Sequence, residues 1–314
     1  MKYLFGPVVS RRLGLSLGID LLPFKTCSFN CIYCECRSTT NLTTGVREYV
    51  PTEEVISELD EFLKSKPELD SLTFSGSGEP TLHSGIGKII NFLKKDYPEY
   101  KITVLTNSTL LNIREVRQSI LNADVIVPTL NAVSSEIFNL ISRPADDITP
   151  EQLISGLIEL RKEFKNKIIL EIFIIPGIND NEKELSLLKD ACIKILPDLI
   201  QLNSLDRPGT ENWIRAASIE KLNEIKEYFL PLKTEIIGNP VARKHKISRR
   251  FSDLSEAIVS TISRRPSTLN DLSAAFGIGE AGLLNILEYL LEKGTIVKEE
   301  SLGRGTFYKL KIKE

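Results

Sequence analysis

The sequence CSFNCIYCEC, from Cys27 to Cys36, determines how the rest of the chain is interpreted. Four of the five cysteines of this 314-residue chain lie within these ten residues. The residues before them do not read as a secretory signal, because a short apolar stretch gives way to Arg11 and Arg12. Crowded cysteines without an export signal favour a metal or redox site over a disulfide framework.

The spacing within this stretch is Cys27-x3-Cys31-x2-Cys34. Three thiolates from one loop can ligate three irons of a four-iron cluster and leave the fourth iron without a protein ligand. A structural zinc site prefers four protein ligands in two pairs, and the sequence has no second cysteine pair. Cys36 is either a fourth ligand or a neighbour of the cluster. Because a Cys-x-Cys step around one small cluster is strained, we expect Cys36 to be a neighbour.

The sequence around the cysteines alternates between two apolar patterns. Short β-branched runs predict strands at residues 15–22, 71–75, 102–106, 125–130, 168–175 and 199–205. Helical spacing predicts helices at residues 52–65, 85–96, 113–122, 150–164 and 182–195, with Thr52 and Thr149 as N-caps. This order predicts an α/β fold with a parallel sheet, either a partial (β/α)6 TIM-like barrel or an open doubly wound sheet.

Glycine and polar residues follow the predicted strands. The segments are 76–80 (GSGEP), 106–108 (TNS), 129–131 (TLN), 176–180 (PGIND) and 203–209 (NSLDRPG). Each segment alone is an ordinary turn. In both candidate folds, however, ligands bind at the carboxyl ends of the strands. Five such segments at one edge therefore indicate a site.

The last quarter of the chain differs from the rest in charge. Residues 1–240 hold 27 Lys and Arg against 33 Asp and Glu, whereas residues 241–314 hold 13 against 9. We expect a barrel at 1–240, a basic linker at 241–250 and a small domain at 251–314. Three predicted helices and a hairpin make that domain similar to a winged helix-turn-helix. The basic linker, with Arg264, Arg265 and Arg304, is the evidence for a contact with nucleic acid.

The cysteine motif, with Tyr33 before its last cysteine, resembles the signature of the radical S-adenosylmethionine (SAM) superfamily. GSGEP stands where that family has a GGE-type motif after the second strand. The resemblance covers about residues 1–240 and implies a partial barrel. It also implies a [4Fe–4S] cluster and SAM as cofactors, with an electron donor of the flavodoxin or ferredoxin type.

The resemblance also implies roles for individual residues. Cys27, Cys31 and Cys34 are the expected cluster ligands. The other expected cofactor contacts are Gly76, Gly78, Glu79 and Pro80 at the methionyl end of SAM, Thr129, Asn131 and Asn107 at its ribose, and Tyr33 and Asn203 at its adenine.

The catalytic residues are unassigned, with Cys36 and Glu171 as candidates. A carboxylate in the apolar run around Glu171 is costly unless it faces a polar lumen. Arg11, Arg12, Arg143 and Arg207 lie near the predicted site, and a solvated surface charge is the favoured interpretation of each one alone. Cys192, on an apolar helix face, is expected in the core.

A closer resemblance links SRRLGLSLGIDLLPFKTCSFNCIYCE (10–35) and QLNSLDRPG (201–209) to Fe–S oxidoreductases grouped with the wyosine tRNA-base synthases. The second cysteine cluster of those enzymes is not present. The expected function is therefore a radical SAM oxidoreductase acting on an unidentified substrate, either an RNA such as tRNA or a peptide or protein. The terminal domain would bind that macromolecule or a partner protein.

The alternative function is an Fe–S redox sensor with a nucleic-acid-binding winged helix, but a sensor has no use for the GSGEP segment. The two-part organisation predicts that removing residues 241–314 leaves SAM cleavage intact. No run of about 18 apolar residues occurs, so we expect no membrane span and a cytoplasmic protein.

Overall fold

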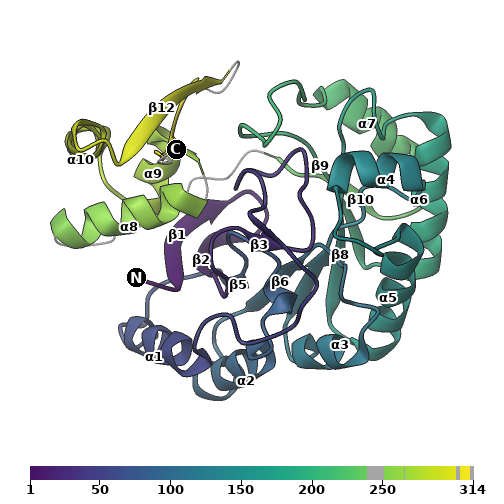
Figure 1. The fold of residues 1–314 in the computed structure, drawn as a ribbon, viewed down its shortest axis with the longest axis horizontal. Coiled ribbons are helices and arrows are strands. Elements are labelled where there is room, and N and C mark those ends of the chain that lie inside the picture. Colours follow the sequence, from purple (N-terminus) through teal and green to yellow (C-terminus); the bar gives the residue numbers. More distant parts are fainter. Residues whose placement is uncertain (239–250, 265, 302–304, 312–314) are drawn as a thin grey trace.

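A curved eight-stranded sheet forms the centre of the computed structural model, which describes residues 1–238, 251–264, 266–301 and 305–311 (Figure 1). The strand order is β1-β2-β5-β6-β7-β8-β9-β10. β1 and β2 are antiparallel, and every pairing from β2 to β10 is parallel. β1 and β10 are the two edges of the described sheet, so the barrel is partial. The strands are β1 (Leu4–Ser10), β2 (Gly14–Ile19), β5 (Ser71–Phe74), β6 (Ile102–Thr106), β7 (Val125–Pro128), β8 (Lys167–Phe173), β9 (Leu199–Asn203) and β10 (Thr234–Ile236).

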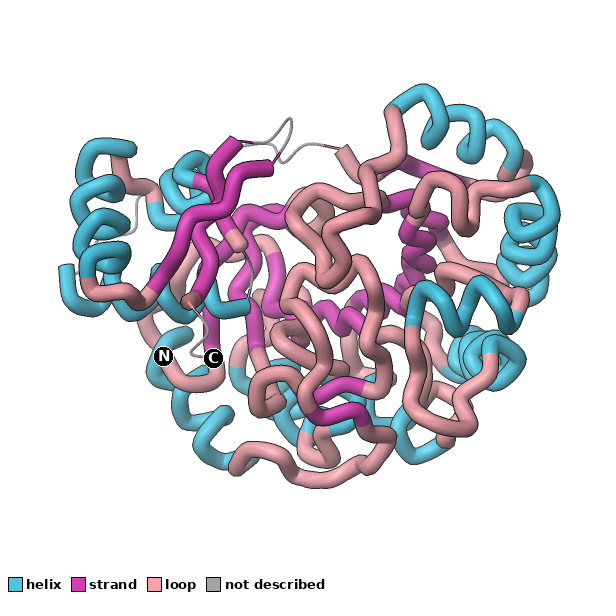
Figure 2. The backbone as a smooth tube through the Cα atoms, turned by 45° about the horizontal axis from the view of Figure 1, so that its top comes forward, coloured by secondary structure: helices cyan, strands magenta, loops and turns pink. Residues whose placement is uncertain are grey.

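Helices cover the outer face of this sheet, as the cyan tubes around the magenta strands show (Figure 2). Each buries an apolar stripe at helical spacing, such as Val55, Leu59 and Leu63. Together with the strands, these stripes form one large core. The helices are α1 (Thr52–Leu63), α2 (Ile86–Asp96), α3 (Arg114–Ile120), α4 (Ser135–Ser142), α5 (Pro150–Glu163), α6 (Glu182–Ile195) and α7 (Ile219–Tyr228).

The predicted α/β fold is confirmed. The bounds of β6 and α6 match the predicted ranges, and Thr149 caps α5 by accepting from the backbone N–H of Gln152. The predicted cap at Thr52 is wrong, because the helix already includes that residue. Both the backbone N–H and the hydroxyl of Thr52 donate to the carboxylate of Glu48 instead.

Six strands and α-helices of the described barrel lie outside the predicted pattern. β1 precedes the first predicted strand, and α4 fills the connection between β7 and α5. β3 (Thr26–Cys27) pairs in parallel with β4 (Asn41–Leu42), which closes the loop that carries the cysteines. α7 and β10 extend the alternation by one more unit at the far edge.

The terminal residues form a unit with its own core, which includes Ile258, Phe276, Leu287 and Tyr308. The observed order of helices and hairpin follows the predicted order, and Thr268 caps α9 by accepting from the backbone N–H of Asp271. The winged-helix interpretation and the domain boundaries stay predictions, and residues 241–250, Arg265 and Arg304 lie outside the described residues. The elements are α8 (Phe251–Arg264), β11 (Ser267–Thr268), α9 (Leu269–Phe276), α10 (Glu280–Glu292), β12 (Ile296–Ser301) and β13 (Gly305–Leu310).

Among the described residues, none of the helices taken by itself combines the length and the apolar composition that a membrane span needs. α9 and α10 reach that length and composition only when they are counted together, across a bend of 116°. Leu272 and Leu283 of this pair are buried in the core of the terminal unit.

A substitution at Gly156 tests how closely α5 packs against the loop after β6. A Cβ atom there would lie 2.5 Å from the backbone nitrogen of Asn112, which cannot move aside as a side chain does. We expect Gly156→Ala to lower the free energy of unfolding by about 1–3 kcal/mol in a denaturant titration. Ser155→Ala, at an exposed position of the same helix, is the control and should change it by less than about 0.5 kcal/mol. Equal stabilities would contradict this packing.

Candidate active site

The loop that carries the cysteines is fixed by backbone hydrogen bonds to three other segments. The carbonyl of Cys27 accepts from the N–H of Thr43 at 2.9 Å. The N–H of Ile32 donates to the carbonyl of Ile141 at 3.0 Å, at the end of α4. The carbonyl of Ile32 accepts from the N–H of Glu211 at 2.9 Å, in the loop after β9. Segments far apart in the sequence therefore hold the loop over the carboxyl ends of the strands.

A cavity of about 220 Å³ lies between this loop and the strand ends. The three predicted cluster ligands line it, together with most of the residues that the family resemblance singled out. The structure therefore brings the cysteine motif and the GSGEP segment to one place. The predicted site residues around this cavity are Cys27, Cys31, Tyr33, Cys34, Gly76, Gly78, Glu79, Asn107, Thr129 and Glu171.

Gly78 lies directly against the cysteine loop. A Cβ atom at Gly78 would stand 1.8 Å from the carbonyl oxygen of Thr26, the residue before Cys27. The next backbone N–H, that of Glu79, donates to the same carbonyl at 3.3 Å. Only glycine allows the turn and the loop to approach this closely.

The carboxyl group of Glu79 is buried and accepts four hydrogen bonds. Oε1 accepts from the hydroxyl of Thr106 at 2.7 Å and from the N–H and hydroxyl of Thr81 at 3.1 and 2.6 Å. Oε2 accepts from the N–H of Asn107 at 2.7 Å. Burial raises the pKa of Glu79, and these donors oppose the shift. Glu79 thus joins the turn after β5 to the end of β6, and Pro80 starts the following 3₁₀ turn without lining the cavity.

Asn107 connects Glu79 to the cysteine loop. Its Nδ2 donates to the hydroxyl of Ser28 at 2.9 Å and lies 3.6 Å from the sulfur of Cys27. Its Oδ1 accepts from the hydroxyl of Thr109 at 2.8 Å. The position of the first cysteine is therefore fixed by the residue that follows β6.

Lys25 is a site residue that the motifs did not single out. Its side chain is 2% exposed and lines the cysteine cavity, and its Nζ donates to the hydroxyl of Thr39 at 3.3 Å. Burial alone lowers the pKa of Lys25, but the thiolates of Cys34 and Cys27 outweigh it and raise that pKa. A positive charge two residues before the first cysteine is the signal that could have identified it.

The thiols differ in how readily they ionise. Burial raises the pKa of Cys27 to about 11 and raises that of Cys31 further, whereas a hydrogen bond from Cys36 lowers the pKa of Cys34. Among the described residues, no three His, Cys, Asp or Glu side chains are close enough to bind one metal ion. Thiolates that bind separate irons stand farther apart than the ligands of one ion. Three thiols around one cavity with a buried lysine therefore fit an anionic cluster.

Tyr33 and Asn131 form one wall of the site. The ring of Tyr33 stacks on that of Phe173, with centroids 4.1 Å apart and planes at 18°. Asn131 lies behind this wall and lines neither of the two cavities near the cysteines. Its Nδ2 donates to the hydroxyl of Tyr33 at 2.7 Å, and its Oδ1 accepts from the N–H of Phe173 at 2.8 Å. Asn131 therefore positions the wall, whereas Thr129 faces the cavity.

A second cavity of about 280 Å³ shares Tyr33, Cys34, Gly76 and Glu171 with the first and extends into the lumen. Glu171 lines both cavities, is 7% exposed and forms an ion pair with Arg12. The carboxylate in the apolar strand therefore faces a polar lumen, as expected from the high free-energy cost of burying a charge among apolar side chains.

Three of the four arginines near the predicted site, Arg11, Arg12 and Arg207, are not solvated surface charges. Arg11 donates to Oδ1 of Asn203 at 3.3 Å and lies 3.6 Å from the carboxylate of Asp206, with its side chain 16% exposed. Arg207 is 2% exposed and donates to Asp271 of the terminal unit at 2.8 Å. Arg143, which is 39% exposed and paired with Glu211, is the one of these arginines that stays near the surface.

Cys36 lines the second cavity and not the one shared by the other three cysteines of the motif. Its sulfur lies 2.8 Å from the carbonyl oxygen of Arg264 and 3.4 Å from that of Gly76. Cys192, in contrast, is fully buried on α6 within the main core, as expected.

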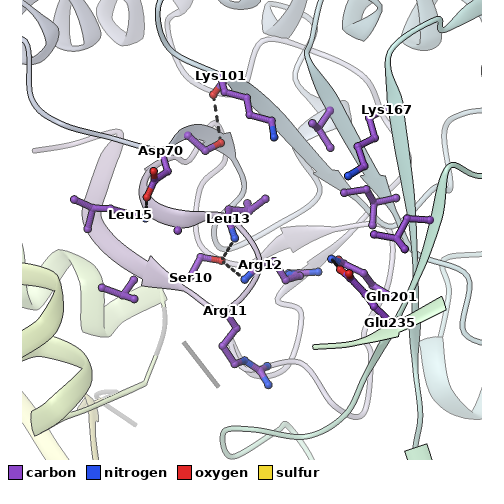
Figure 3. A pocket seen from close by; sticks show the side chains of 16 residues that line it. Ser10, Arg11, Arg12, Leu13, Leu15, Asp70, Lys101, Lys167, Gln201 and Glu235 are labelled. Carbon is purple, nitrogen blue, oxygen red and sulfur yellow. Dashed lines mark hydrogen bonds between the residues drawn. The ribbon is translucent and has the colours of Figure 1, made fainter. Parts of the chain in front are cut away.

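A third cavity, of about 600 Å³, lies at the amino ends of the strands (Figure 3). Lys101, Lys167 and Gln201 line it, and none of the predicted site residues does. Arg11 and Arg12 line both this cavity and the second one. The β1–β2 loop that carries them therefore forms a floor between the two.

The Radical SAM superfamily model matches residues 21–188, which is more than half of the chain and includes the cysteine motif, the GSGEP turn and Glu171. The chain belongs to the radical SAM superfamily. It is therefore a radical SAM enzyme, with a [4Fe–4S] cluster and SAM as cofactors.

Curated relatives align along nearly the whole chain. A protein named GTPase Obg from Brachyspira hyodysenteriae is 36% identical over 95% of this chain, which spans only 44% of that protein's length. A UPF0026 protein from Methanocaldococcus jannaschii is 30% identical over 100% of this chain and 97% of its own length. The radical SAM chain therefore has relatives both as a full-length protein and as part of a longer one.

Solved structures share the fold. A radical SAM methyltransferase from Sphaerobacter thermophilus has a TM-score of 0.56 at 15% identity, covering 70% of this chain and 66% of that one. TYW1 with a lysine-pyruvate adduct has a TM-score of 0.50 at 17% identity, covering 72% and 75%. At these identities, the likeness shows a common barrel alone.

The placement of Cys36 predicts different results for two cysteine variants. Cys31→Ala should lose most of the bound iron after anaerobic reconstitution, because it removes a predicted ligand. Cys36→Ala should keep the wild-type iron content of about four per chain. Iron and sulfide analysis, with the absorbance of the cluster, measures both. Equal loss of iron in the two variants would show that Cys36 is a ligand.

Proposed function

We propose that this radical SAM enzyme is an oxidoreductase that removes a hydrogen atom from a substrate bound in the lumen beside Glu171. The observation that supports the proposal is the meeting of three cysteines and the GSGEP turn at one cavity, which shares Glu171 and other lining residues with the lumen cavity. The family gives the cofactors, and the lumen cavity beside them is the position that we propose for the substrate.

Cys27, Cys31 and Cys34 would hold the cluster, and the backbone around Gly78 would receive the methionyl end of SAM. When bound, these cofactors supply an electron and a carbon radical formed by cleavage of SAM. The chain's own residues orient and shield them. Lys25 places a buried positive charge beside the thiolates, and the Tyr33–Phe173 stack closes one side against water.

The size and charges of the lumen limit the substrate. A cavity of about 280 Å³ admits a side chain, a nucleobase or a small molecule, so a macromolecule would insert only one such group. Arg12 and Glu171 offer both charges there, in an ion pair that a polar group of the substrate can enter. An RNA or a peptide is the proposed substrate class, and a donor of the flavodoxin or ferredoxin type would supply the electron.

Reductive cleavage of SAM tests the proposal. Anaerobic protein loaded with iron and sulfide, incubated with SAM and dithionite, should form 5′-deoxyadenosine and methionine in equal amounts. Liquid chromatography measures both products. Cys31→Ala should reduce them to background, and Cys192→Ala should not, because Cys192 is buried in the core away from the site. An intact cluster that yields neither product would overturn the proposal.

A further inference from the structure

The terminal unit contacts the barrel next to the site. α8 lies along β1 at the open edge of the sheet (Figure 1). The hydroxyl of Ser260 donates to the carbonyl of Leu4 at 3.3 Å, and Nη2 of Arg264 donates to the carbonyl of Lys2 at 3.2 Å. The last turn of α8 is thereby held against the first residues of the chain.

Arg264 extends from this turn into the lumen. It lines the same cavity as Cys36 and Glu171, and its side chain is 15% exposed. Its Nε donates to Oδ2 of Asp20 at 2.7 Å, and its guanidinium lies 5.4 Å from the centre of the Phe5 ring. One side chain of the terminal unit is therefore part of the wall of the site.

Asp20 connects Arg264 to the GSGEP turn, because it accepts hydrogen bonds from both. Its side chain is 3% exposed, and the oxygen that accepts from Arg264 also accepts from the N–H and hydroxyl of Ser77 at 3.2 and 2.9 Å. Gly76 has φ 145°, and a Cβ atom there would lie 2.3 Å from the carboxyl carbon of Asp20. The carboxylate is thus packed against the backbone of Gly76 and Ser77.

Cys36 makes a second link between the same segments. Its sulfur contacts the carbonyls of both Arg264 and Gly76, which ties the end of the cysteine loop to α8 and to the turn. Loss of the arginine would leave a buried carboxylate without this cation, which is costly, so the carboxylate would move toward water or other donors. The shift would reach Ser77 directly.

We infer that Arg264 is a positioning residue for the SAM-binding turn. The terminal unit therefore contributes to the radical SAM site by supplying this side chain. The inference rests on the proposed function only in assigning SAM to this turn. It also changes the expectation from the sequence that removal of residues 241–314 leaves SAM cleavage intact, because that removal takes away Arg264.

Hydrogen exchange of the full-length protein without cofactors tests the positioning by itself. In Arg264→Gln, the amide of Ser77 should exchange about tenfold faster, equivalent to about 1.4 kcal/mol, because its acceptor Asp20 is no longer fixed. Arg264→Lys should restore much of the protection. The matched control is Arg161→Gln, which also removes an arginine in the last turn of a helix that pairs with an aspartate, Asp198, at 2.8 Å.

The second measurement is SAM cleavage by the loaded variants. Arg264→Gln should raise the KM for SAM about tenfold and leave kcat and iron content near wild type. If the exchange at Ser77 and the KM both stay unchanged, or if exchange rises equally throughout the sheet, Arg264 has no positioning role. If exchange rises only at the turn and wild-type protein cleaves no SAM, the positioning stands and the proposed function fails.

Discussion

The buried carboxylate of Glu79 is the interaction on which the site depends. It accepts hydrogen bonds from both sides of the gap between two strand ends, and a hydrogen bond to a charged group typically contributes about 1.5–3 kcal/mol. Because Glu79 fixes Asn107, and Asn107 reaches Ser28 and Cys27, the turn and the cysteine loop take up one arrangement. Gly78 lets the two backbones touch. The cysteine motif and the GSGEP motif are therefore one structure, although about 40 residues separate them.

The barrel was predictable because its strands and helices differ strongly in pattern. Apolar β-branched runs marked β5 to β9, and i, i+4 stripes marked the helices between them. β1 was not predicted, because Gly6 and Pro7 interrupt its apolar pattern. Its pairing with β2 also shifts register between Phe5 and Val8. α4 was not predicted, because its eight residues are too few to show a clear helical period.

The site was predictable only where a motif identifies residues that are close in sequence. The cysteines, the GSGEP turn and the unusual Glu171 were found that way. Asp20 and Arg264 are 244 residues apart, and only the folded chain shows that they pair. Arg11, Arg12 and Arg207 were misread for the same reason, since charge in a sequence does not reveal a buried partner. The terminal unit, which reads as a separate module, supplies part of the wall of the lumen.

The central claim is that three cysteines hold a cluster whose remaining iron is open to SAM beside the GSGEP turn. Electron paramagnetic resonance of the reduced, iron-loaded protein, recorded with and without SAM, tests it most directly. An iron that is open to SAM should give the signal of a reduced [4Fe–4S] cluster with g values that change when SAM is added. A cluster with full iron content and a signal that SAM leaves unchanged would show instead that no iron is open to SAM.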